Sequence, residues 1–131
     1  LVSLDLGSTH TQDLSVVSNL VSLVTLHVDN NLVQDLTPLS TLTGNSFVYL
    51  TLSHNEITDV SPLAHLTFED LSLRGNQITD LTPLVASPSF GIGAVVDLTS
   101  NPLNCSNQDT LDAIQTLLDR GVNLTTDCDS S

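Results

Sequence analysis

The side chains best suited to chemistry in this sequence are histidines that recur near carboxylates. His27 would lie beside Asp5, and His54 near Asp29, if the segments that carry them form adjacent strands. Such pairs can hold a divalent cation or respond to acidification. Two ligands make a poor metal site, and exposed histidines are usually only solvated. We therefore predict no metal site.

Catalysis has little support in the sequence. Serine, histidine and aspartate are plentiful enough for chance proximity, but there is no nucleophile elbow and no glycine-rich phosphate loop. The repeating pattern described below implies no buried pocket. We therefore predict that the protein is not an enzyme, with no catalytic residue and no cofactor.

The charge balance narrows the choice of partners. Fifteen acidic residues stand against two basic ones, Arg74 and Arg120, in 131 residues, for a formal net charge of -13. Such a surface repels phosphate backbones and anionic lipids, so we expect no nucleic-acid partner. No apolar run approaches the roughly 18 residues that a membrane-spanning helix needs, so we expect no membrane insertion.

A segment of about two dozen residues recurs along the chain. The copies share an alternating apolar pair, and they start at Leu4, Leu26, Leu50, Leu71 and Val96, which are 22, 24, 21 and 25 residues apart. Because side chains alternate at period two in a strand, each pair predicts a short strand with one buried face. Stacking the five copies would place these strands side by side in a parallel sheet.

Two polar columns accompany the predicted strands. An inward-pointing amide after each strand can pair backbone groups of the turn that the sheet leaves unpaired. An aspartate then precedes a helical turn, where we predict a capping role in preference to a metal or acid-base site. The first column is Thr9, Asn31, Asn55, Asn76 and Asn101, and the second is Asp13, Asp35, Asp59 and Asp80.

The segments "LTLSHNEITDVSPL" and "LSLRGNQITDLTPL" resemble the short leucine-rich repeats, about 22 residues long, of bacterial secreted and surface proteins of the internalin type. The resemblance covers nearly the whole chain. It implies an α/β repeat solenoid, a right-handed leucine-rich repeat arc with a short parallel concave sheet, a 3-10 or irregular convex side and a C-terminal capping helix. It also implies a concave face that binds a protein or glycan partner outside the cell or at its surface.

The C-terminal region departs from the repeat. We predict repeats over residues 1–104, with the first one incomplete, and a cap over residues 105–131 with a helix at about 108–120. The helix would cover the end of the last coil with one apolar face. That face comprises Leu111, Ile114, Leu117 and Leu118.

Two cysteines, Cys105 and Cys128, flank the predicted helix. A bridge between them would stabilise the cap by about 3 kcal/mol. A disulfide would also place the protein outside a reducing cytosol. Two free thiols in a cytosolic scaffold are the alternative.

The first predicted strand begins at once, and no helix, hairpin or cysteine covers its edge. An uncovered coil exposes leucines and unpaired strand backbone. We therefore expect the chain to be a piece of a longer protein, with more repeats or a cap before Leu1. The same edge suggests self-association and an alternative function, a structural subunit of an extracellular fibre or surface layer assembled by solenoid packing.

Strand residues outside the buried pairs would point to the concave face. This surface is polar and acidic, with a single aromatic, Tyr49, and a single cation, Arg74. Because tyrosine and arginine are enriched in binding hot spots, these two are the leading anchors. The candidate ligand-binding residues are Asp5, His27, Tyr49, Thr51, Asp70, Arg74 and Asp97.

Overall fold

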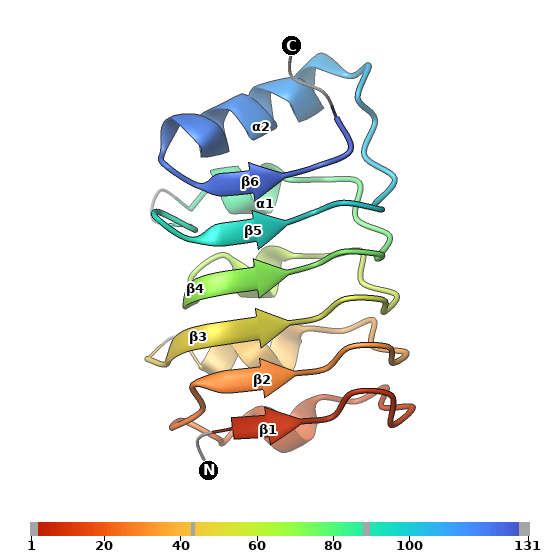
Figure 1. The fold of residues 1–131 in the computed structure, drawn as a ribbon, viewed down its shortest axis with the longest axis vertical. Helices are drawn as coiled ribbons and strands as arrows, with labels where there is room; N and C mark the ends of the chain where they lie inside the picture. Colours follow the sequence, from red (N-terminus) through yellow and green to blue (C-terminus); the bar gives the residue numbers. More distant parts are fainter. Residues whose placement is uncertain (1–2, 43, 88–89, 129–131) are drawn as a thin grey trace.

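A computed structural model describes residues 3–42, 44–87 and 90–128. Its strands form one six-stranded parallel sheet in which they follow one another in chain order (Figure 1). The chain is thus a stack of coils, which confirms the predicted solenoid. The strands are β1 (Ser3–Asp5), β2 (Thr25–His27), β3 (Ser46–Thr51), β4 (Thr67–Ser72), β5 (Val95–Asp97) and β6 (Asn123–Thr125).

The strands pair in the register that the repeat predicts. Leu26 on β2 pairs with Leu4 on β1 and with Leu50 on β3, and Leu71 on β4 continues the row. Leu26, Leu50 and Leu71 are fully buried. Apolar side chains of all the coils therefore form one continuous core, which is how repeats too small to fold alone become stable.

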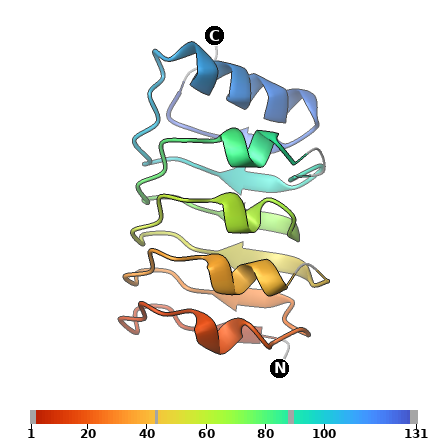
Figure 2. The same ribbon diagram turned by 180° about the vertical axis from the view of Figure 1, so that it is seen from behind.

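The side of the stack opposite the sheet carries a row of short helical segments (Figure 2). Three are 3-10 helices, whereas the fourth is a single α-helical turn. Each turns an apolar side chain into the core, and the last three have proline in the first turn, where its missing N–H costs nothing. The segments are η1 (Ser15–Val17), η2 (Thr37–Thr41), η3 (Ser61–Leu63) and α1 (Thr82–Val85).

The predicted C-terminal helix is present as α2 (Gln108–Asp119). It continues the convex row and packs on α1 and β6 (Figure 2). Its buried residues are Ala113, Ile114 and Leu117, whereas Leu111 and Leu118 are half-buried. After it, β6 pairs with β5, so the sheet gains a sixth strand that the five-copy alignment did not predict. In the described part of the chain, no helix is long and apolar enough to cross a membrane.

Arg120, notable in the sequence only for its charge, joins α2 to the preceding coil. Its guanidinium donates hydrogen bonds to the carbonyl oxygens of Leu84, Val85 and Ser87. These carbonyls lie in the last turn of α1 and just after it, where a helix end leaves carbonyl groups with spare capacity to accept hydrogen bonds. A planar, charged group with several donors suits such a cluster of acceptors, so Arg120 fixes the position of α2.

β3 and β4 are longer than the other strands. They begin three residues before Tyr49 and Asp70, the positions where the neighbouring strands start to pair with them. Phe47 and Phe68 stand in register at these extra positions. Phe68 contacts Phe90 edge to face, with ring centroids 5.3 Å apart. Phe47 and Phe90 are fully buried. The three phenylalanine side chains are thus all part of the core.

Cys105 and Cys128 form a disulfide that closes the segment carrying α2 and β6. Their Cα atoms are 5.3 Å apart, and their positions differ by 23 in the sequence.

Removing this disulfide should destabilise the protein. Closing a loop of this length stabilises by about 3 kcal/mol, because the cross-link restricts the unfolded chain. We expect the double variant Cys105→Ser, Cys128→Ser to lose about 3 kcal/mol of unfolding free energy in urea titrations. The single variant Ser106→Ala, at an exposed site beside the bridge, is the control. Equal stability of the double variant and the wild type would contradict the expectation.

Candidate functional site

The asparagine column fixes the turns that follow the strands. The Asn76 side chain accepts hydrogen bonds from the backbone N–H groups of Asn55 and Ile57 in the preceding coil. It donates to the carbonyl oxygens of Leu52, in the preceding coil, and Leu73, in its own. One buried amide therefore ties two coils together. The side chains of Asn31, Asn55 and Asn101 make hydrogen bonds of the same kind. In the first coil the equivalent residue is Thr9, whose backbone N–H donates to the Asn31 side chain.

The aspartate column lies one residue before the N-cap of each convex helix. The N-cap residues themselves are apolar and make no side-chain capping bond. Each carboxylate instead accepts the N–H of the residue two positions later, the first residue of the helix. Each aspartate thus pairs an N–H group that the helix leaves free, as a side-chain N-cap would, but it does so from the residue before the N-cap. They are Asp13, Asp35, Asp59 and Asp80.

Two of these carboxyls should contribute acid-sensitive stability. The hydroxyl and backbone N–H of Thr82 lower the pKa of Asp80, and the backbone N–H and hydroxyl of Thr37 lower the pKa of Asp35. Because the folded-state pKa lies below the unfolded value of about 4, this contribution is complete above that pH. It is lost as the pH falls through the lowered folded-state pKa.

We expect Asp80→Asn to reduce the acid dependence of stability. The measurement is the difference in urea unfolding midpoint between about pH 7 and about pH 3, which should be smaller in the variant than in the wild type. Glu69→Gln, at an exposed site, removes the same charge away from any convex helix. An Asp80→Asn variant with the full wild-type dependence would contradict this role for the carboxylate.

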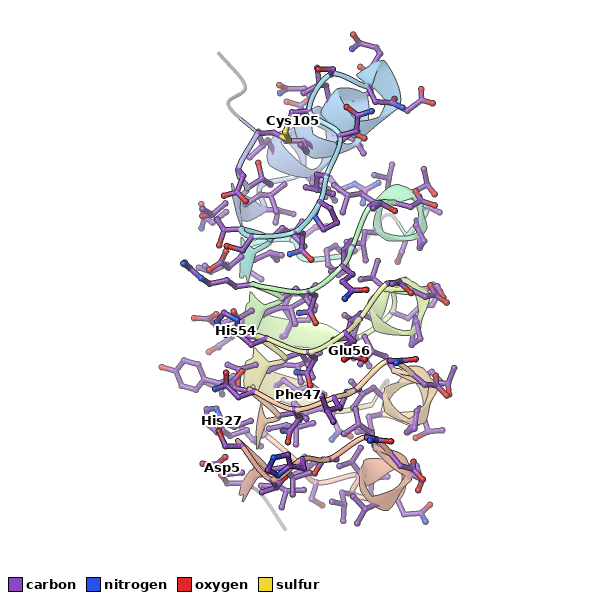
Figure 3. All side chains as sticks on the ribbon, turned by 90° about the vertical axis from the view of Figure 1, so that its right-hand side faces the viewer. Asp5, His27, Phe47, His54, Glu56 and Cys105 are labelled. Carbon is purple, nitrogen blue, oxygen red and sulfur yellow. A yellow bond between two sulfur atoms is a disulfide. The ribbon has the colours of Figure 1, made fainter. Side chains whose placement is uncertain are left out.

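The outward side of the sheet, together with the turn residue Arg74, is termed the strand face below. Tyr49 on β3 and Val95 on β5 are 50% and 44% exposed there. Figure 3 places Asp5 and His27 on this side of the stack, away from the convex helices. The other predicted site residues on the strands are Thr51, Asp70 and Asp97, all half-buried.

Hydrogen bonds hold His27 in one orientation on the strand face. Thr51 Oγ1 donates to Asp29 Oδ2 at 3.0 Å and lies 3.0 Å from His27 Nδ1. Since a hydroxyl has one hydrogen, Thr51 accepts from the His27 Nδ1–H. The Nε2 atom of His27 is then left as an acceptor. The sequence analysis paired Asp29 with His54 and did not connect it to His27.

The histidine-carboxylate pairs of the sequence do not assemble into a metal centre. Asp5 accepts the backbone N–H of Gly7 at 2.8 Å, and His27 is engaged with Thr51. His54 packs in the turn against Gly75, where an added Cβ would collide with the imidazole, so the glycine leaves the space that the His54 ring occupies. Within the described ranges, no three His, Cys, Asp or Glu side chains are grouped so that they could hold a metal ion.

Two hollows lie outside the strand face. One, of about 420 Å³, is lined on the turn side by Gln12, Leu32, Gln34, Asp35 and Glu56. The other, of about 340 Å³, lies between α1 and α2 and is lined by Thr82, Val85, Ala86, Asp109, Asp112, Ala113 and Thr116. Neither contains a residue of the strand face, so any binding there would be independent of it.

The stacked parallel strands, the convex helical row and the asparagine column define a leucine-rich repeat solenoid with an internalin-like fold. Two crystal structures of Listeria monocytogenes proteins resemble it. Internalin C2 has a TM-score of 0.74 and 26% identity, covering 96% of this chain and 51% of its own. Internalin F has a TM-score of 0.70 and 31% identity, covering 96% of this chain and 34% of its own.

This chain therefore spans about half the length of one internalin and a third of the other. The sequence matches no family model and no curated protein. The likeness thus rests on the comparison of three-dimensional structures, and it supports the predicted resemblance at the level of the leucine-rich repeat fold.

Proposed function

We propose that this chain is a non-catalytic binding module that recognises a macromolecular partner, a protein in preference to a glycan, through its strand face. The observation that carries the proposal is the exposure of Tyr49 and Val95 on an otherwise polar sheet. Large apolar or aromatic side chains at the centre of a rigid surface are typical anchors of protein interfaces. The internalin-like fold supports the same role.

The rigidity of the strand face favours binding. Its strands are fixed on the inner side by buried leucines and in the turns by the asparagine column. A surface that is ordered before binding loses little conformational entropy when a partner docks. The turn residue Arg74 is exposed and supplies the positive charge at the edge of this acidic surface.

The proposal is tested by screening the purified chain against a displayed library of extracellular protein domains and against a glycan array. For each ligand found, Tyr49→Ala and Arg74→Ala should weaken binding at least about tenfold, as hot-spot residues do. Val16→Ala and Gln115→Ala, at exposed positions of η1 and α2, are the matched controls. Loss of binding only in the two convex variants would overturn the proposal.

We also propose an extracellular or cell-surface location and a capping role for residues 105–131. The disulfide supports the location, because such bonds are rare in a reducing cytosol. The contacts of α2 with α1 and of β6 with β5 support the capping role. Light scattering on the purified chain separates partner binding from the self-association that a fibre subunit would show.

A further inference from the structure

The acidic side chains of the strand face, and of the turns next to it, differ in what they can offer a ligand. Most are already engaged as acceptors of hydrogen bonds from the turns next to their strands. The engaged carboxylates are Asp5 with Gly7 N–H, Asp29 with Ser53 N–H and the Thr51 hydroxyl, and Asp97 with the N–H and hydroxyl of Thr99. Among the described residues, no hydrogen bond to the Asp70 carboxylate is found. Asp70 therefore has its full capacity to accept hydrogen bonds available.

The free carboxylate lies between the two exposed anchors of the strand face. Asp70 on β4 pairs in register with Tyr49 on β3 and with Val95 on β5. Side chains of registered residues point to the same side, and neighbouring strands are about 4.8 Å apart. An aromatic ring, a carboxylate and an aliphatic side chain thus form a row across three strands.

This row has the chemistry that recognises an arginine side chain. A guanidinium can donate two parallel hydrogen bonds to a carboxylate and can stack on an aromatic ring. Its methylene groups can cover an aliphatic neighbour such as Val95. The net charge of -13 attracts basic partners to the whole surface, and Asp70 has the exposed side chains of Tyr49 and Val95 on either side.

We propose that Tyr49, Asp70 and Val95 form a subsite that binds an arginine side chain of a basic protein partner. The inference rests on the proposed function, since it names the chemistry that the strand face recognises. In this contact the partner supplies the positively charged guanidinium and this chain supplies the Asp70 carboxylate.

The test is a titration of the ¹⁵N-labelled chain with N-acetyl-arginine-N-methylamide, followed by backbone amide chemical shifts. Saturable shifts should centre on residues 49, 70 and 95. The citrulline analogue, which keeps the shape and lacks the charge, should give none. Asp70→Asn should weaken arginine binding at least about threefold, in line with the strength of exposed cation–π and ion-pair contacts.

Asp119→Asn is the matched control, because it removes the same charge at an exposed position of α2, away from the strand face. This variant should bind arginine like the wild type. Equal weakening by both variants, equal shifts with citrulline, or the absence of saturable shifts would overturn the subsite. If Tyr49→Ala and Arg74→Ala still abolish binding of a library partner in any of these cases, the proposed function stands and only the arginine subsite fails.

Discussion

Asn76→Ala is expected to lower the unfolding free energy by about 4 kcal/mol, because it leaves several buried backbone groups without partners. The side chain is 5% exposed and serves the N–H groups of Asn55 and Ile57 as well as two carbonyl oxygens. Each unpaired buried group costs about 1 to 3 kcal/mol, and an alanine at this position can replace none of the bonds. Urea unfolding followed by circular dichroism measures the loss.

Two further variants sharpen this test. Asn19→Ala removes an exposed amide and should change stability by less than about 0.5 kcal/mol. Asn76→Asp keeps the acceptor oxygen but loses the donor N–H₂ group and introduces a charge in a buried site, so it should also be strongly destabilising. A stable, fully folded Asn76→Ala protein would show that the turns do not depend on the amide column.

Phe47→Ala should destabilise the protein by a comparable amount, about 4 kcal/mol, since it removes a large side chain from a packed core. Phe47 is 1% exposed and lies in register with Phe68 on the next strand. The coils cannot collapse into the space left behind, because the sheet and the amide column fix their spacing. The decrease in thermal unfolding midpoint or urea midpoint measures the effect.

Tyr49→Ala is the matched control for Phe47→Ala. It removes an aromatic ring of similar size from the same strand, but from the outward side, where the ring is 50% exposed. The cost should be under about 1 kcal/mol. Similar losses in both variants would contradict the assignment of inward and outward sides on β3.

The sequence predicts most features of each coil, because every coil uses the same kinds of residue at the same offsets. The alternating apolar pair, the amide and the aspartate recur at fixed offsets, so register and stacking follow from their alignment. β6 was missed because its Asn123–Thr125 segment follows a helix and lacks the repeat's second apolar residue. The phenylalanine column was missed because only the copies at Leu50 and Leu71 carry phenylalanine three residues before the pair.

Other contacts depend on long-range geometry that no spacing in the sequence specifies. Arg120 reaches carbonyl groups more than thirty residues away in the chain. Asn45, a buried amide outside the predicted column, donates to the carbonyl oxygens of Leu20 and Leu23. Each of these side chains looks like an ordinary polar residue until the coils are stacked.

The same limit applies to the strand face. The sequence predicts which side chains point outward, but not which carboxylates the turns occupy. Asp5 and Asp97 end their strands and accept the N–H of the residue two positions later, whereas Asp70 is followed by two more residues of β4 and has no such donor in the described part of the chain. The difference between a structural acid and a ligand-binding acid therefore emerges only from the three-dimensional structure.

Hydrogen exchange of the asparagine side-chain amides, measured by NMR, tests the stacked-coil account most directly. The asparagine column comprises Asn31, Asn55, Asn76 and Asn101. Its side-chain N–H₂ groups donate to buried carbonyls, so their protons should exchange far more slowly than those of the exposed Asn19 and Asn30. Exchange of the column amides at the same rate as the exposed ones would contradict the account, because the coils would then not be joined through these side chains.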